Sequence, residues 1–278
     1  MSAEGGTAVD PPYGRWADPS FLRRVQYADA GNFSARQSIY RYQQPRIGLY
    51  DWALDLAGLE GGERILDVGC GNGGYLKALH QRGHGGLTVG VDFSAGMLRS
   101  ARSATGTDGP QPLVQGDAAA LCFATGSVDV GLAMHMLYHV PDRGRALAEL
   151  RRVVAPGGVA LVVLNGRGHT AEVRSLIREW FAVTGTGRRG ERGEGLDLDA
   201  GEELVSRHFD CERHEVRSQL VVPEAQPVVD YVRSLSVVAA GTAEEPSLLE
   251  YVREKVTASI ASDGAFRIAT ASGCLVCR

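Results

Sequence analysis

The sequence has almost no lysine, because only Lys77 and Lys255 among its 29 basic residues are lysines. Acidic residues number 33, so the formal net charge is -4 at pH 7. This composition provides no broad positive field, which disfavours binding along a nucleic-acid backbone. We therefore expect a small molecule or a protein, and no nucleic acid, as the partner.

Long apolar runs are also missing. None approaches the roughly 20 residues that span a bilayer. The start MSAEGGTAVDPP lacks the basic and apolar regions of a signal peptide. These absences predict a cytoplasmic protein with no membrane segment.

Cysteine is sparse, and the five cysteines form no regular pattern. An odd, scattered set argues against a disulfide framework. Cys274 and Cys277 form a CxxC pair, but no second pair accompanies it, and in a strand-like tail residues three apart face opposite sides. No metal site is predicted.

The chain is hydrophobic enough, at 44%, to bury a substantial core. Gly and Pro at 1–20 predict a poorly ordered start, and apolar residues at helical spacing over 21–60 predict an N-terminal helical cover. The main domain is expected at 61–278, with a helical insertion at 224–261 near the ligand side. The glycine- and arginine-rich stretch 185–195 is predicted to be a mobile loop.

Short apolar runs alternate with helical patterns along the main domain, which is typical of a doubly wound α/β sheet. The predicted strands are 64–69, 88–93, 112–116, 128–134, 159–165, 211–222 and 265–277. The predicted helices between the first of these are 73–82, 94–104, 143–154 and 171–182. The Pro-Gly-Gly at 156–158 predicts a helix stop and a turn into the next strand.

The sharpest local signal is RILDVGCGNGG at 64–74, an apolar strand that ends in a glycine-rich turn and opens a helix. Gly69 and Gly71 allow the backbone to pass close to a nucleotide-like ligand. Asp92 lies near the end of the next predicted strand, in the run TVGVDF, where a carboxylate can accept from both ribose hydroxyls. Asp92 can alternatively cap the helix that starts near Ser94.

Spacing alone does not select the ligand, because Gly69, Gly71 and Gly74 also satisfy the GxGxxG pattern of dinucleotide-binding proteins. Asp67 lies two residues before the first glycine and would repel a pyrophosphate, whereas a sulfonium and an ammonium would tolerate it. With Gly73, these residues resemble the first motif of the class I S-adenosylmethionine (SAM)-dependent methyltransferases, an acidic residue followed by GxGxG.

The resemblance continues in order through VDFSAGML at 91–98, GDA at 116–118, VDVGLAMHMLYHVPD at 128–142 and LRRVVAPGG at 150–158. It is strongest to the broad group that includes ubiquinone-biosynthesis enzymes and many small-molecule methyltransferases. It implies a Rossmann-like, seven-stranded, mostly parallel sheet with an antiparallel last strand, and SAM as the cofactor.

The resemblance also implies contacts along the whole cofactor. The methionyl part is expected at Asp67, Gly69, Met134 and His135, the ribose at Asp92, and the adenine at Phe93, Met97, Asp117 and Ala118. Asp117 can alternatively be a turn residue and Met97 a core residue.

Methyl transfer from a sulfonium is an in-line displacement, so an enzyme mainly aligns donor and acceptor and needs no nucleophilic residue. A hydroxyl acceptor normally needs a base. His135 and His139, at the end of the fourth predicted strand, are the candidate bases. Tyr27 in the cover is a third catalytic candidate, although packing into the cover is the more common role for such a residue. His139 can alternatively hold its loop in place. Three aromatic residues are candidates for the wall of the acceptor pocket, although aromatic residues at such positions are more often part of the core: Tyr138, Trp180 and Tyr231.

The predicted function is therefore methylation of a small, partly apolar metabolite, with oxygen ahead of nitrogen and carbon. Two different classes stay open: a SAM-binding protein with altered or lost chemistry, such as a scaffold or a cyclase-like relative, and an NAD-dependent oxidoreductase. The sequence leaves the oligomeric state open, a homo-oligomer included.

Overall fold

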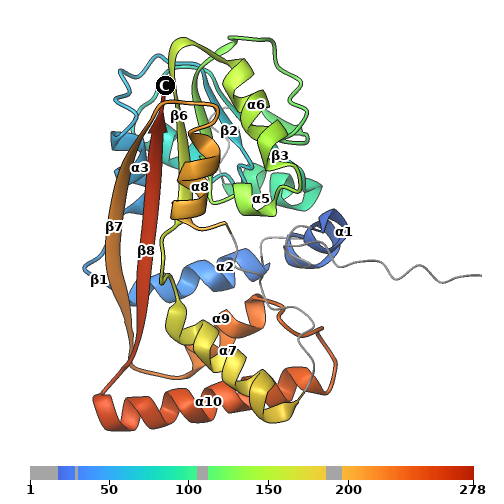
Figure 1. Ribbon diagram of the computed structural model, residues 1–278, viewed down its shortest axis with the longest axis vertical. Helices are drawn as coiled ribbons and strands as arrows, with labels where there is room; N and C mark the ends of the chain where they lie inside the picture. Colours follow the sequence, from blue (N-terminus) through green and yellow to red (C-terminus); the bar gives the residue numbers. More distant parts are fainter. Residues whose placement is uncertain (1–17, 29–30, 105–111, 186–195) are drawn as a thin grey trace, which may run out of the picture.

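An eight-stranded mixed sheet is the central feature of the computed structural model, which describes residues 18–28, 31–104, 112–185 and 196–278 (Figure 1). Nearly all of the predicted start and of the predicted loop at 185–195 lies outside these residues. The first described helix, α1 (Pro19–Phe21), begins slightly before the predicted end of the start segment.

The strands are β1 (Gln43–Gln44), β2 (Ile65–Val68), β3 (Thr88–Asp92), β4 (Leu113–Gln115), β5 (Val128–Met134), β6 (Val154–Asn165), β7 (Cys211–Val222) and β8 (Phe266–Cys277). Their order in the sheet is β1-β7-β8-β6-β5-β2-β3-β4. The neighbours from β4 to β6 pair in parallel, and β8 runs antiparallel to both β6 and β7. The predicted doubly wound sheet with an antiparallel last strand is confirmed.

The predicted count of seven strands is wrong by one. Gln43 and Gln44 pair antiparallel with Leu220 and Gln219 and extend the edge of the sheet beyond β7. This strand was missed because it is two residues long and lies inside a segment whose apolar spacing is helical.

The longer helices are α2 (Gly31–Ser38), α3 (Leu49–Asp55), α4 (Gly74–Gln81), α5 (Ala95–Ala104), α6 (Arg143–Val153), α7 (Ala171–Thr184), α8 (Leu198–Val205), α9 (Gln226–Ser234) and α10 (Glu244–Asp263). Three short turns complete the described elements: η2 (Leu22–Gln26), η3 (Ile39–Tyr42) and η4 (Leu137–His139). None of the described helices is both long and apolar enough to cross a membrane.

Strand β6 shows why the sheet is covered on both faces. Leu161 and Val163 pack into the cluster that contains Leu54 of α3, whereas Val162 and Leu164 pack into the cluster that contains Leu147 of α6. Because side chains alternate along a strand, a strand buried on both faces is continuously apolar. The run VALVVL therefore makes β6 a central strand.

The Pro-Gly-Gly segment differs from its prediction. Strand β6 begins at Val154, and the pairing with β5 then jumps from Val154 to Val159. Gly157 takes a left-handed φ of 80° within this irregularity. The segment is thus a bulge inside β6, where a turn before the strand was expected.

A third apolar cluster joins α7, α9 and α10 to the N-terminal segment through residues such as Val173, Val229, Leu248 and Ile39. Figure 1 shows these three helices gathered beyond the sheet, at the end of β8 opposite the C-terminus, with α2 between them and the sheet. The predicted insertion therefore packs against the predicted N-terminal cover.

Candidate active site

A cavity of about 660 Å³ lies where the parallel strands end. The loops after β2, β3, β4 and β5 form one side of it, and the N-terminal segment, β7 and β8 form the other. Twelve of the thirteen site residues predicted from the sequence line it: Tyr27, Asp67, Gly69, Gly71, Asp92, Phe93, Met97, Asp117, Ala118, Met134, His135 and His139.

The glycine turn after β2 depends on the absence of side chains. Gly69 and Gly71 have left-handed φ angles of 73° and 57°. A Cβ on Gly69 would also lie 2.7 Å from the Cβ of Met136, so the turn packs tightly against the segment after β5. Gly73 does not line the cavity; with a φ of 79° it precedes α4 and starts that helix.

The carboxylate of Asp67 lies in the cavity wall without any hydrogen bond. Its side chain is 1% exposed, and neither carboxylate oxygen has a hydrogen-bond partner. Burial, and secondarily the nearby charge of Asp92, raises the pKa of Asp67 to about 8. A buried carboxylate without partners fits a cationic ligand group, which would supply the missing charge.

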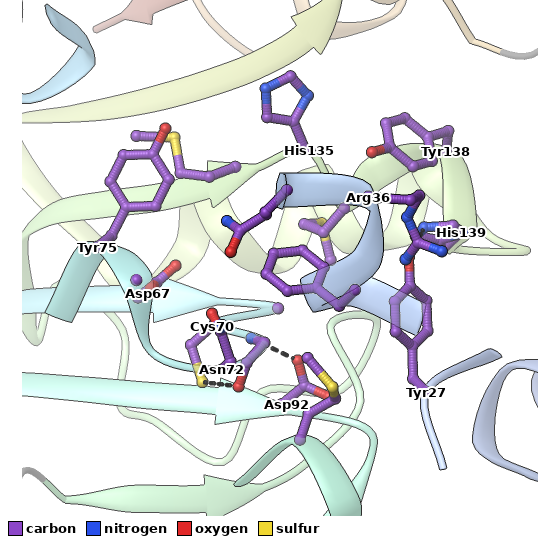
Figure 2. Close-up of a pocket in the computed structure, with 18 of the residues that line it drawn as sticks. Tyr27, Arg36, Asp67, Cys70, Asn72, Tyr75, Asp92, His135, Tyr138 and His139 are labelled. Atoms are coloured by element: carbon purple, nitrogen blue, oxygen red, sulfur yellow. Dashed lines mark hydrogen bonds between the residues drawn. The ribbon is translucent and has the colours of Figure 1, made fainter. Parts of the chain in front are cut away.

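Asp92 is held by the backbone on both sides. One oxygen accepts from the Gly71 N–H at 2.8 Å, as the dashed line to Asp92 in Figure 2 shows. The other accepts from the Ser94 N–H at 2.8 Å. Burial raises the pKa of Asp92 in spite of these bonds. Asp92 therefore braces the glycine turn and the start of α5, and each carboxylate oxygen retains a lone pair for a ligand hydroxyl.

Asp117 and Met97 each combine a structural position with a place in the cavity wall. Asp117 accepts from the Ala119 N–H at 2.8 Å, which is a turn contact, and it also lines the cavity. Met97 is 2% exposed, as a core residue would be, and it also reaches the cavity wall.

Two of the candidate catalytic residues meet directly. The Tyr27 hydroxyl lies 2.8 Å from Nε2 of His139, and the two rings are edge-on, with centroids 5.3 Å apart. Tyr138 packs edge-on against the other side of His139 at 4.5 Å. In Figure 2 the Tyr27 hydroxyl points to the His139 ring, on the side of the cavity away from Asp67.

His135 lies apart from this pair (Figure 2). Its backbone takes a left-handed φ of 55°, and its N–H donates to the Val163 carbonyl at 2.9 Å. Burial lowers the pKa of His135 to about 4, so its ring is neutral near pH 7 and accepts a proton poorly.

The N-terminal segment closes on the loop that carries Asp92. The Ser94 hydroxyl donates to the Tyr27 carbonyl at 2.6 Å. A Cβ on Gly96 would lie 2.0 Å from the Ala28 carbonyl oxygen, so only glycine allows this approach. A glycine in the first turn of a helix, such as Gly96, is the one sequence feature that could have indicated this close contact.

The far side of the cavity contains residues that sequence reasoning missed. The Tyr40 hydroxyl lies 3.2 Å from Nε2 of His169, and Gln43 donates to the Ser218 hydroxyl at 2.8 Å. Ser218 in turn lies 2.7 Å from the Thr270 hydroxyl across β7 and β8. No local pattern marks these residues, because the sheet brings them together from distant segments.

Of the three aromatic candidates for the acceptor pocket, Tyr138 and Tyr231 line the cavity. Trp180 does not line the cavity and takes the alternative position in the core. Trp180 is 2% exposed, packs against Phe181 and donates its indole N–H to Ser247 at 3.2 Å, between α7 and α10. Across the described ranges, no three His, Cys, Asp or Glu side chains are grouped to hold a metal ion.

The family model described as a methyltransferase domain matches residues 66–162. Methyltransferase GfsG of Streptomyces halstedii is 32% identical over 180 residues, which cover 63% of this chain and 58% of that protein. A demethylmenaquinone methyltransferase of Staphylococcus aureus (strain JH9) is 38% identical over 146 residues, covering 52% of this chain and 60% of that protein. The chain thus spans about three fifths of the length of these relatives.

A solved structure of phosphoethanolamine N-methyltransferase 2 from Haemonchus contortus, in complex with S-adenosyl-L-methionine, superposes with a TM-score of 0.59. The match is 21% identical and covers 98% of this chain and 60% of that chain. At this identity the likeness establishes the fold. Together with the family match, it confirms the resemblance that the sequence motifs predicted.

Proposed function

We propose that this chain, which contains a class I methyltransferase domain, transfers the methyl group of SAM to a small, partly apolar acceptor. The observation that carries the proposal is Asp67, a buried carboxylate with no hydrogen-bond partner in the same cavity as the glycine turn and Asp92. SAM, when bound, supplies a methyl group on a sulfonium. Asp67 would bind the cationic methionyl part, and Asp92 would bind the ribose hydroxyls.

The adenine would lie beyond Asp92 along the cavity wall. Phe93 and Met97 offer apolar surfaces for its two faces, and Asp117 offers a carboxylate for the exocyclic amino group. Met134 would lie beside the methionyl part, because it ends β5 next to the glycine turn. Ala118 would contribute its backbone.

Tyr27 and His139 supply the base that we propose for an oxygen acceptor. In this arrangement the Tyr27 hydroxyl donates to Nε2 of neutral His139, so a proton leaving the acceptor hydroxyl passes to Tyr27 oxygen as Tyr27 protonates His139. His135, whose pKa is lowered to about 4, is the weaker base and serves as part of the wall. This pairing favours oxygen over nitrogen or carbon as the methylated atom.

The rest of the cavity suits a small acceptor with an apolar body. Tyr40, Tyr138 and Tyr231 provide aromatic surface, and the N-terminal segment bonded through Ser94 keeps water from the reacting atoms. The protein would align the acceptor oxygen with the methyl group for in-line displacement. The cytoplasmic location and the absence of a nucleic-acid partner remain predictions from the sequence.

The first experiment is a calorimetric titration of the full chain with SAM, S-adenosylhomocysteine (SAH) and NAD. Micromolar binding of both adenosyl ligands, without binding of NAD, supports the proposal. Binding of NAD alone would sink it and would favour an NAD-dependent oxidoreductase.

Turnover requires a separate measurement, because binding does not distinguish an enzyme from a scaffold or a cyclase-like relative. The rate of SAH release from SAM in the presence of an acceptor panel provides it. SAH release that depends on one class of acceptor supports methyl transfer, whereas tight SAM binding with no release from any panel member favours a scaffold.

A further inference from the structure

The carboxylates of the cavity are unevenly distributed. All three carboxylates that line it lie on the proposed cofactor side: Asp67 within β2, Asp92 at the end of β3 and Asp117 after β4. The described residues of the other side contribute hydroxyl, amide, imidazole and aromatic groups, but no carboxylate: Tyr40, Gln43, His169, Ser218, Tyr231 and Thr270. A cationic acceptor would find no opposite charge there.

Arg36 of α2 places a positive charge in the cavity wall beside the proposed base. Its guanidinium carbon lies 5.5 Å from the centre of the Tyr27 ring. One terminal nitrogen, Nη1, donates to the Ser234 carbonyl at 2.9 Å, and Gln26 donates to the same oxygen at 3.1 Å. These contacts hold the guanidinium in one place.

The second terminal nitrogen of Arg36, Nη2, is buried and has no hydrogen-bond partner. Within the described ranges no carboxylate forms an ion pair with Arg36. A buried charged donor without an acceptor is costly, and a guanidinium binds oxyanions best. Figure 2 shows Arg36 on the same side as Tyr27 and His139, away from Asp67 and Tyr75. The unpartnered donor therefore lies on the acceptor side.

We propose that Arg36 determines acceptor specificity by binding a negatively charged oxygen of the acceptor through its free Nη2 donor. The acceptor class is then a small aromatic or conjugated molecule that carries a carboxylate, an enolate or a phenolate. Neutral amides of the same shape bind more weakly, and amines are excluded. The inference rests on the proposed function, since it assumes that the cofactor occupies the side with Asp67 and Asp92.

The test uses the full chain saturated with SAH and three probes of similar size: 4-hydroxybenzoate, 4-hydroxybenzamide and tyramine. Dissociation constants are measured by calorimetry. We expect the acid to bind at least tenfold more tightly than the amide, and tyramine to bind more weakly than either. R36M should abolish the preference for the acid, and R36K should keep part of it.

The matched control is R41M, because Arg41 lies in the same N-terminal segment over the partly buried Tyr42 ring and outside the cavity. R41M should retain the preference of the unchanged protein. SAH affinity is measured for every variant and shows whether each is folded and loaded. An R36M variant that has lost SAH affinity at an unchanged melting temperature would assign Arg36 to the cofactor and overturn the inference.

Equal binding of acid and amide to the SAH-saturated protein, or binding of neither, also overturns it. Failure of the unchanged chain to bind SAH is a different result, since it refutes the proposed function itself. If R36M unfolds at a lower temperature than the unchanged protein, R36K is used in its place. An intermediate preference of R36K for the acid over the amide supports the inference, and an unchanged preference contradicts it.

Discussion

Tyr27 and His139 are 112 positions apart in the chain, and yet the hydroxyl of one lies 2.8 Å from the imidazole nitrogen of the other. Tyr27 reaches this position because the Ser94 hydroxyl holds its backbone carbonyl at 2.6 Å. The proposed base is therefore tied to the loop that carries Asp92. The hydrogen bond from Ser94 to Tyr27 thus links the position of the loop after β3 to the position of the proposed base.

Removing either member of this pair should slow methyl transfer while sparing cofactor binding. We expect Y27F and H139Q to lower the rate of SAH release about 100-fold with the acceptor found in the panel, the usual range for loss of a general base. Y42F is the matched control, because the Tyr42 hydroxyl donates to Glu224 at 2.6 Å outside the cavity. A Y27F variant with full turnover would leave the pair without a role in proton transfer.

Cofactor affinity should depend on pH through Asp67, whose pKa is raised to about 8. A cationic ligand binds the ionised carboxylate, so affinity rises with pH below about 8, by up to tenfold per unit. It stops rising near pH 8, where the α-amino group of SAM also loses its proton, with a pKa of about 8. Calorimetry from about pH 6 to about pH 8 should show this slope in the unchanged protein and a flatter one in D67N. A flat profile in the unchanged protein would contradict the assignment.

Replacing Asp67 and replacing Asp92 should change the stability of the ligand-free protein in opposite directions. The folded-state pKa of Asp67 lies above the ordinary value of 3.8, so its contribution to stability is present below that value and is lost as pH rises through about 8. D67N removes this loss and should raise the melting temperature at pH 8. D92N should lower stability by about 1 to 3 kcal/mol, because an amide cannot accept from both the Gly71 and the Ser94 N–H groups.

Thermal unfolding of both variants at about pH 5 and about pH 8 checks the contrast, since most of the expected loss falls between these two values. The gain from D67N should shrink at the lower pH. If D67N destabilises the protein as much as D92N does, the Asp67 carboxylate accepts a hydrogen bond in the folded state, which would contradict the unpartnered position described above.

Gly69→Ala should weaken cofactor binding beyond the effect of its backbone strain. Its φ of 73° is costly for any residue with a Cβ, by about 1 kcal/mol or more. The new Cβ would also meet the Met136 side chain at 2.7 Å and displace the turn. We expect a loss of SAM affinity of at least tenfold by calorimetry.

Gly83→Ala is the matched control for Gly69→Ala. Gly83 has a similar φ of 74°, but a Cβ added there would have nothing within 4 Å, and the residue is outside the cavity. This variant should carry the backbone strain and keep its SAM affinity. Equal losses of affinity in the two variants would show that strain alone, and not the contact with Met136, is responsible.

The side of the cavity that contains Asp67 and Asp92 was predictable because its residues belong to short contiguous segments. A parallel strand followed by a turn and a helix brings its loop to the carboxyl edge of the sheet, so RILDVGCGNGG and TVGVDF place Asp67 and Asp92 together. The lining by Asp117, Met134 and His135 follows from the same rule. The strand Gln43–Gln44 and the buried position of Trp180 did not follow, because neither has a local signature that outweighs helical spacing.

The sequence by itself determined the order of strands and helices from β2 onward, the glycine turn and the carboxylates beside it, because hydrophobic periodicity and the chirality of crossover connections act over short ranges. Only the tertiary structure decided which residues meet across the cavity. The contacts of Tyr27 with His139, Arg36 with Ser234 and Ser218 with Thr270 join distant segments. Their geometry depends on how helices pack against one edge of the sheet, which side-chain packing sets and local sequence does not encode.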